Sequence, residues 1–245
     1  MKEEAVEIPT VDGTADGFLY VDKKKRGPGF LFLTDIGGIR PSQREMAARV
    51  AGEGYTVLLP NMFYRTHQTP LFEPPVNFAD EATRRKFGEL KAALAPEAVD
   101  RDAAGYADFL ASRSETAEGP IGAMGLCFAG AVAMRIAAAV PERVRAVASF
   151  HGGGLFTEAP DSPHLLLPRI RARLYFGHAV EDRSMPADAI AKFDGALAAW
   201  GGRYESEIYE GAHHGWTVPD SPVYNRPQAE RAFQKLTELL AETLR

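Results

Sequence analysis

Cysteine is nearly absent from the chain, since Cys127 is the only one among 245 residues. A single cysteine excludes an intramolecular disulfide framework and a zinc site built from several cysteines. An excess of positive charge is also lacking, because 28 Lys and Arg residues stand against 33 Asp and Glu residues. With a formal net charge of -5, the chain has no overall attraction to nucleic acid or to an anionic membrane. Neither is therefore expected as a partner.

Long hydrophobic segments are scarce as well. The N-terminus is charged and has no apolar core of the length found in signal peptides, which favours a cytoplasmic protein. Residues 121–140 resemble a membrane span because Arg135 is their only charge, but they contain three glycines and much alanine. A buried strand followed by a buried helix explains this stretch better.

Apolar runs of strand length alternate along the chain with segments of helical character. The runs are residues 18–21, 30–34, 55–59, 121–124, 146–150, 174–177 and 206–209, and the helical segments are residues 42–53, 97–111, 128–140, 187–200 and 228–244. The alternation predicts one α/β domain over residues 1–245, with a mostly parallel central sheet and helices on both faces. We expect the first two runs to pair as an antiparallel edge, because they lie too close for a helix between them. Residues 61–86 are rich in proline and aromatic residues without clear periodicity, which is typical of a lid or a substrate-binding loop.

Cys127 lies where an apolar run meets a helical stretch, in the sequence GLCFAG of residues 125–130. A strand, a sharp turn and a helix can present a nucleophile at the turn, whose strained backbone needs small neighbours such as Gly125 and Ala129. The start of a helix also favours a thiolate. The alternative is an inert buried cysteine, because free cysteines are commonly buried. A dinucleotide site is excluded, since the glycines do not fit G-x-G-x-x-G.

Two later loops supply an acid and a base, and each follows a predicted strand. The first carries Glu181 and Asp182, and the second carries His213 and His214. The order nucleophile, acid, histidine, with each residue after a strand, matches the α/β-hydrolase arrangement. Parallel strands bring such loops to one edge of the sheet. A metal site is disfavoured, because adjacent histidines diverge and no carboxylate cluster accompanies them.

Three segments together resemble the dienelactone hydrolase family of α/β-hydrolases, whose nucleophile is a cysteine. They are GLCFAG around Cys127, GHAVEDRSMP around Asp182 and YEGAHHGW around His214, and the resemblance extends from about Gly29 to the C-terminal helix. It implies a catalytic triad of Cys127, Asp182 and His214, and it selects Asp182 over Glu181 and His214 over its neighbour. It implies neither a cofactor nor a metal.

The resemblance also implies how the thiol and the oxyanion are controlled. The family places an acidic residue after an early strand, in contact with the resting thiol, and Asp35 occupies that position where the best-known members have glutamate. The backbone N–H groups of Ile36 and Phe128 would then form the oxyanion hole.

Family members that act on dienelactone hold its carboxylate with arginines. Arg84 or Arg85 could fill the first of these roles, and Trp216 is a candidate substrate-binding residue next to the histidine. No arginine follows His214 at the expected place, and Arg226 is farther on. The missing arginine leaves open a general carboxylesterase or thioesterase on the same scaffold.

Residues 151–154, HGGG, look like the oxyanion motif of lipases and esterases. That motif precedes the nucleophile, whereas this one follows it, so we interpret the segment as a flexible strand-end loop near the rim of the active site.

The sequence therefore predicts hydrolysis of a small-molecule ester or lactone of dienelactone type, through a covalent thioester, by a monomer or small homo-oligomer. The alternatives are the carboxylesterase or thioesterase and a non-catalytic binding protein that keeps the fold. A papain-like protease using Cys127, His214 and Asn225 is disfavoured, because a hydrophobic strand precedes the cysteine.

Overall fold

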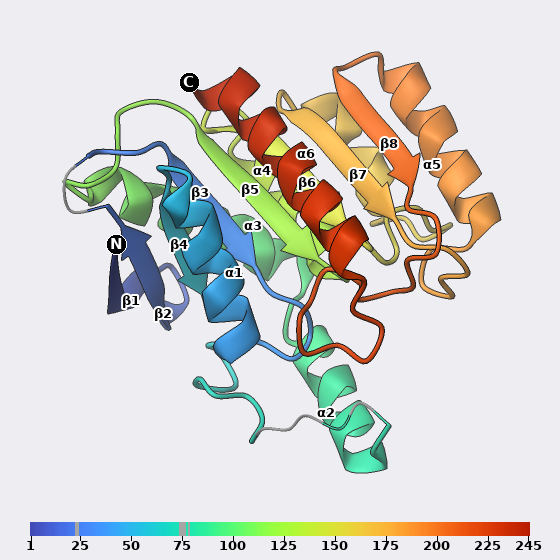
Figure 1. Cartoon of the computed structure of the whole chain (residues 1–245), viewed down its shortest axis with the longest axis horizontal. Helices are drawn as coiled ribbons and strands as arrows, with labels where there is room; N and C mark the ends of the chain where they lie inside the picture. Colours follow the sequence, from blue (N-terminus) through green and yellow to red (C-terminus); the bar gives the residue numbers. More distant parts are fainter. Residues whose placement is uncertain (23–24, 74–76, 78) are drawn as a thin grey trace.

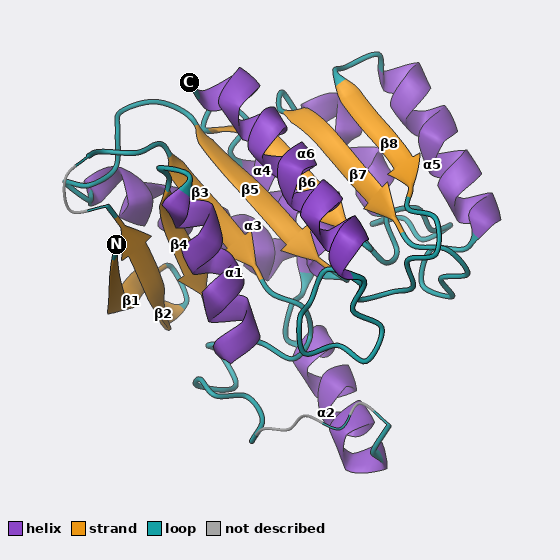
Figure 2. Ribbon diagram, in the orientation of Figure 1, coloured by secondary structure: helices purple, strands orange, loops and turns teal. Residues whose placement is uncertain are grey.

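Eight strands form one sheet in the computed structural model, which describes residues 1–22, 25–73, 77 and 79–245 (Figures 1 and 2). The strands are β1 (Lys2–Thr10), β2 (Gly13–Val21), β3 (Gly29–Leu33), β4 (Thr56–Pro60), β5 (Ile121–Leu126), β6 (Val144–Phe150), β7 (Arg173–His178) and β8 (Tyr204–Ile208). They are ordered β1-β2-β4-β3-β5-β6-β7-β8, and β3 to β8 run parallel. The expected mostly parallel sheet is thus confirmed, with all seven predicted strands in it.

The antiparallel edge differs from the expectation in its partners. β2 pairs with β1 and β4 and not with β3, because the chain passes through helix α1 (Pro41–Gly52) and returns as β4 between them. A right-handed crossover of this kind places β4 beside β3. β1 was not predicted, since only Val6 and Ile8 of its side chains point to the core and charged residues alternate with them. Charges of this kind are typical of an edge strand.

Helices cover both faces of the sheet (Figure 1). They are α1, α2 (Glu81–Ala92), α3 (Pro96–Ser112), α4 (Ala129–Ala139), α5 (Ala187–Trp200) and α6 (Arg226–Leu244), with a 3₁₀ helix at Pro163–Arg169. α1 and α6 pack on one face through residues such as Val50 and Leu236. α3, α4 and α5 pack on the other through residues such as Ala103, Ile136 and Phe193.

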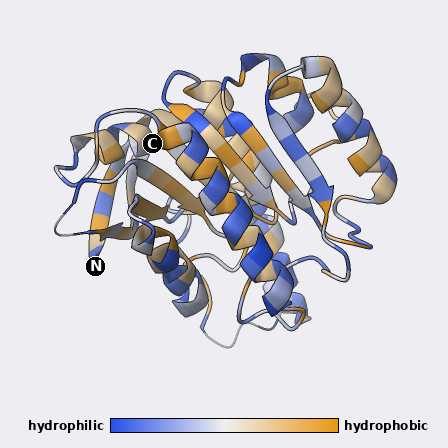
Figure 3. Ribbon diagram, turned by 45° about the horizontal axis from the view of Figure 1, so that its top comes forward, coloured by the Kyte–Doolittle hydropathy of each residue, from blue (hydrophilic) through white to orange (hydrophobic). Residues whose placement is uncertain are grey.

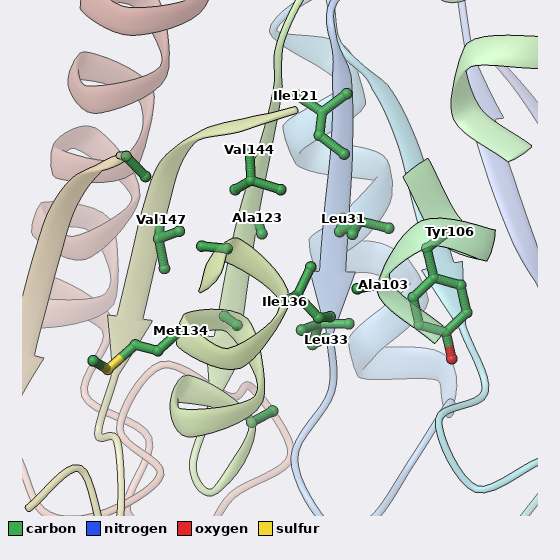
Figure 4. Packing of buried hydrophobic residues seen from close by; sticks show 14 of the residues in the cluster. Leu31, Leu33, Ala103, Tyr106, Ile121, Ala123, Met134, Ile136, Val144 and Val147 are labelled. Atoms are coloured by element: carbon green, nitrogen blue, oxygen red, sulfur yellow. The ribbon is translucent and has the colours of Figure 1, made fainter. Parts of the chain in front are cut away.

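The layer between the sheet and helices α3 and α4 is built of aliphatic side chains (Figure 4). Leu31 and Leu33 of β3 lie beside Ile136 of α4 and Tyr106 of α3, and each is at most 2% exposed. The central strands are apolar on both sides, whereas the edge strand β8 is mostly hydrophilic (Figure 3). Residues 121–140 form β5 and α4, and none of the helices among the described residues is long and apolar enough to cross a membrane.

Part of the segment expected to be irregular, residues 61–86, lies outside the described residues at positions 74–76 and 78. In the described part, the last six residues begin α2. Asp80 caps this helix by accepting a hydrogen bond from the Thr83 N–H at 2.9 Å. Before the helix, Phe63 and Leu71 are buried with Leu90 in a small cluster. Ile36 and Phe128, on the loops after β3 and β5, pack against that cluster.

Arg65 anchors the same segment to α3. Its guanidinium donates to both carboxylate oxygens of Asp102 at 2.7 and 2.8 Å, and the Asp102 side chain is only 4% exposed. Because a buried carboxylate without its cation is costly, Arg65 fixes the position of residues that pack beneath Ile36 and Phe128.

Replacing Arg65 by methionine is expected to lower the free energy of unfolding by about 3 kcal/mol, because Asp102 stays buried without its cation. Urea denaturation measures the change. Arg101→Met is the matched control, since the Arg101 side chain is half-exposed and its ion pair is with Asp12, which keeps Arg65 as a partner, so stability should stay nearly unchanged. Equal stability of the two variants would contradict the anchoring role of Arg65.

Candidate active site

The loops that follow β3, β5, β6 and β8 surround a cavity of about 350 Å³. Parallel strands put these ends on one edge of the sheet, so residues far apart in sequence meet there. The cavity is lined by Asp35, Ile36, Arg40, Cys127, His151, His214, Gly215, Val218, Ser221, Pro222 and Val223. The sequence analysis named Cys127, His214, Asp35 and Ile36 among these residues, and it missed Arg40 and the four lining residues between positions 218 and 223.

Cys127 sits at a sharp turn between β5 and α4, with a left-handed backbone at φ 58°. A side chain at Gly125 would place its Cβ 1.9 Å from the Ala129 carbonyl oxygen, and one at Gly130 would lie 2.1 Å from the Ser149 hydroxyl. Backbone atoms block any side chain at position 125, whereas a side chain at position 130 would require Ser149 to move. The turn leaves Cys127 partly exposed at the cavity, directly before the first turn of α4.

Asp182 and His214 meet after β7 and β8. The Nδ1–H of His214 donates to Asp182 Oδ2 at 2.6 Å. Asp182 Oδ1 accepts two further hydrogen bonds, from the Ser184 N–H at 2.8 Å and its hydroxyl at 2.7 Å. Both neighbours with competing side chains, Glu181 and His213, are exposed instead. The Asp182 side chain is 4% exposed, so its charge is held by these contacts and not by water.

The electrostatics of this pair favour a charged histidine. Burial lowers the pKa of His214, but its interactions with Asp182 and Cys127 outweigh burial and raise that pKa to about 10. Burial raises the pKa of Asp182, yet the hydrogen bonds from His214 and Ser184 hold it below its usual value. With Nδ1 engaged by Asp182, the Nε2 atom of His214 is the nitrogen available to Cys127. The arrangement can therefore hold an imidazolium beside a sulfur nucleophile.

Two backbone N–H groups near Cys127 are free to bind a substrate oxygen. Neither the Ile36 N–H nor the Phe128 N–H donates a hydrogen bond to any residue that the structure describes. Ile36 lines the cavity, and Phe128 immediately follows Cys127. The side chains of Ile36 and Phe128 both pack against the buried cluster of Phe63, Leu71 and Leu90. This packing holds the backbone of Ile36 and Phe128 in place.

Asp35 does not make the contact expected of a thiol-modulating acid. Its carboxylate accepts from Arg40 at 2.7 and 2.8 Å, from the Gly37 N–H at 2.8 Å and from Gln43 at 3.2 Å, and none of its hydrogen bonds reaches Cys127. The physical reason is the nearby guanidinium, which engages both oxygens of a side chain one methylene shorter than glutamate. Asp35 lines the cavity but shapes the loop that carries Ile36.

His151 lies inside the site and not at its rim. It is 1% exposed, its backbone is left-handed at φ 43°, and its N–H bonds the Gly177 carbonyl at 2.8 Å. Its Nδ1 accepts from the Cys127 N–H at 3.1 Å, and its Nε2 bonds the Thr217 hydroxyl at 2.9 Å. Burial and the neighbouring His214 lower the pKa of His151 well below its usual value, so the ring is neutral. The only sequence signal for this residue was the HGGG motif of residues 151–154, which follows the nucleophile instead of preceding it.

The three predicted substrate-binding residues do not line the cavity. Arg84 and Arg85 are exposed on α2, which extends beyond the carboxyl edge of the sheet (Figure 1). Trp216 is fully buried, stacked on Tyr209 with ring centroids 4.9 Å apart and edge-to-face with His151 at 5.2 Å. Trp216 therefore supports the site from the core and is not available to a substrate.

Comparison with known proteins connects this geometry to a family. The model of the dienelactone hydrolase family matches residues 15–244. A carboxymethylenebutenolidase from Rhodococcus opacus is 29% identical over 224 residues, which cover 89% of this chain and 82% of the relative. A Synechocystis protein assigned as a carboxymethylenebutenolidase is 27% identical over 221 residues, covering 89% and 87% of the two chains.

A solved structure shares the fold over nearly the whole length. The crystal structure of a Klebsiella pneumoniae protein assigned as a dienelactone hydrolase superposes with a TM-score of 0.86, covering 98% of both chains at 20% identity. This likeness shows a common fold.

Gly125→Ala is expected to distort the turn at Cys127, because the new Cβ overlaps the Ala129 carbonyl oxygen. Forced overlap of this kind costs about 1–3 kcal/mol of folding free energy, measured by urea denaturation. The matched control is Gly195→Ala, an exposed position in α5 with open space around its Cβ, which should be stabilised slightly. Equal effects at the two glycines would contradict the steric argument.

Asp182→Asn removes the anionic acceptor of the His214 Nδ1–H. We expect the pKa of His214 to fall from about 10 towards its ordinary 6.5, because burial then meets less opposition. NMR titration of the histidine ring measures the midpoint, and Glu181→Gln is the matched control at the exposed neighbouring acid.

The raised pKa of His214 also makes the free energy of unfolding depend on pH. The protonated His214 ring stabilises the fold fully below pH 6.5, and this contribution is lost as the pH rises towards about 10. In Asp182→Asn, the free energy of unfolding should therefore fall less than in the wild type as the pH rises from 6.5 towards about 10. A wild-type midpoint near 6.5 would contradict the ion-pair geometry.

Proposed function

The chain belongs to the dienelactone hydrolase family, whose members have the α/β-hydrolase fold, and we propose that this hydrolase cleaves carboxylic esters or lactones through Cys127, His214 and Asp182. One observation carries the proposal. Cys127 follows β5, Asp182 follows β7 and His214 follows β8. His214 bonds Asp182 at 2.6 Å and lines the same cavity as Cys127. Such a set of strand-end residues is the pattern of acyl-transfer hydrolases.

In the first half of the reaction, the Cys127 thiolate attacks the substrate carbonyl carbon and the carbonyl electrons move to oxygen. The N–H groups of Ile36 and Phe128 donate hydrogen bonds to this oxyanion. When the tetrahedral intermediate collapses, the bond to the leaving alkoxide breaks and the His214 imidazolium gives the alkoxide its proton. A thioester on Cys127 and a neutral His214 remain.

In the second half, His214 takes a proton from a water molecule as the water attacks the thioester carbonyl. The second tetrahedral intermediate collapses with the Cys127 thiolate as leaving group, which releases the carboxylic acid product. The imidazolium and the thiolate are thereby restored. The pKa of His214, raised to about 10 although burial opposes it, supports a ring that is protonated at neutral pH before each cycle.

In this proposal Asp182 and Asp35 have different tasks. Asp182 fixes the ring orientation of His214 and stabilises its charge. Asp35 is a positioning residue: its carboxylate accepts from the Gly37 N–H at 2.8 Å and its carbonyl from the Gly38 N–H at 3.0 Å. These bonds set the turn that holds the Ile36 N–H.

The proposal is tested with Cys127→Ala and Cys127→Ser on 4-nitrophenyl acetate and on an enol-lactone. We expect kcat to fall by a factor on the order of 10³ or more in Cys127→Ala, which removes the nucleophile, and to fall less far in Cys127→Ser, because a hydroxyl can be acylated but is a weaker nucleophile than a thiolate. Circular dichroism and thermal unfolding check that the fold is kept. Turnover at the wild-type rate in Cys127→Ala would overturn the proposal.

The adjacent histidines offer a matched pair for the same assay. His214→Ala should lose activity as Cys127→Ala does, whereas His213→Ala should keep it, since His213 is exposed and makes only backbone contacts. If instead the chain is a non-catalytic binding protein, neither substrate is turned over by the wild type, and iodoacetamide labels Cys127 slowly and independently of His214.

A further inference from the structure

Arg40 lines the cavity beside Cys127 and His214, where a guanidinium would be expected to bind a substrate carboxylate. Its own hydrogen bonds leave no donor for that purpose. Nη1 and Nη2 donate to the two oxygens of Asp35 at 2.7 and 2.8 Å, and Nε and Nη2 donate to the two oxygens of Asp220 at 2.8 and 3.2 Å. The second hydrogen on Nη1 goes to the Gly38 carbonyl at 3.2 Å. All five N–H groups of the side chain are therefore in use.

The charge of Arg40 is also more than balanced. Two carboxylates, Asp35 and Asp220, contact one guanidinium whose side chain is only 9% exposed. Burial raises the pKa of Asp220, but its bonds to Arg40 outweigh burial and hold it below its usual value. This Asp35–Arg40–Asp220 ion-pair group thus carries a net negative charge at neutral pH, which repels an anion.

The rest of the described cavity wall supplies no other cation for a substrate. His151 is neutral, because its Nδ1 accepts from the Cys127 N–H and burial lowers its pKa. His214 is charged but bound to Asp182. The remaining lining residues are uncharged, and apart from Gly215 and the Ser221 hydroxyl they are apolar: Ile36, Val218, Pro222 and Val223.

We propose that the cavity accepts esters and lactones whose acyl group is uncharged, and that the Asp35–Arg40–Asp220 ion-pair group sets this specificity. The inference rests on the proposed function and narrows its substrate class. A carboxylate on the acyl group would lose its hydration on entry, find no free donor on Arg40 and face excess negative charge. An alkyl group at the same place loses nothing and is buried against the apolar lining residues.

The ion-pair group also joins two loops that lie far apart in sequence. Asp35 and Arg40 lie on the loop between β3 and α1, and Asp220 lies on the loop after His214. A substrate carboxylate could bind Arg40 only by displacing one of the two aspartates, which would open that junction. The same ion-pair group therefore joins the two loops and keeps Arg40 from binding a substrate carboxylate.

The experiment compares two esters of equal shape, mono-4-nitrophenyl adipate and 4-nitrophenyl 6-methylheptanoate, in which an isopropyl group replaces the distal carboxylate. We expect the wild-type kcat/KM to be at least about tenfold higher for the neutral ester at neutral pH, since an unpaired carboxylate is costly in this cavity. A ratio at or below unity would overturn the inference.

Asp220→Ala tests whether the ion-pair group is the cause. The variant frees two donors of Arg40 and removes one negative charge, so the ratio should fall by about tenfold through faster turnover of the adipate ester. Asp108→Ala is the matched control, because Asp108 pairs with an exposed arginine, Arg143, away from the cavity. An unchanged ratio in Asp220→Ala would overturn the role of the ion-pair group.

Cys127→Ala separates failure of this inference from failure of the proposed function. If the variant is inactive on both esters while the wild type shows no preference, the catalytic assignment stands and the specificity inference falls. If the variant keeps its activity, the catalytic assignment falls whatever the ratio is.

Discussion

The left-handed backbone at Cys127 is the constraint around which the other parts of the site are arranged. A residue at φ 58° between a buried strand and a helix is strained, and it persists only where the surroundings hold it. Gly125 and Gly130 leave room for the turn, and the Cys127 N–H is shared between the Phe150 carbonyl at 3.2 Å and the His151 ring at 3.1 Å. His151 is in turn left-handed and held by Thr217. The partly exposed Cys127 side chain thus depends on buried contacts from β5, from the end of β6 and from the loop after β8.

Local sequence patterns were sufficient for the central strands and for the candidate triad. An apolar run buried on both faces is readable from a few residues, and Cys127 directly follows such a run. Asp182 and His214 lie on loops after later strands, and the family resemblance selected them over their neighbours. The sequence patterns of β1 and α2, at the periphery of the fold, were weaker. β1 alternates charges with apolar residues, and α2 exposes most of its surface, so neither had a continuous apolar signal. The position of β4 between β2 and β3 depends on a crossover, which no local pattern encodes.

The residues that line the cavity beside the triad were harder to predict, for a physical reason. Arg40 and Asp220 are 180 positions apart, and their pairing exists only once β3 and β8 bring their loops together. Asp35 was assigned to the thiol from the family resemblance, and its bonds to Arg40 and Gln43 exist only in the folded loop. Trp216 follows the histidine closely, but a bulky apolar ring gains more from burial against Tyr209 than from the cavity.

The small cluster of Phe63, Leu71 and Leu90 has a consequence for how such a site can diverge. In the described part of the chain, this cluster packs against Ile36 and Phe128, two residues on separate loops of the site. Drift in residues 61–94 can therefore alter the spacing of two amide groups without changing any side chain that meets a substrate. Selection acting on that segment would retune the stabilisation of charge in the transition state, while the reacting groups themselves stay the same.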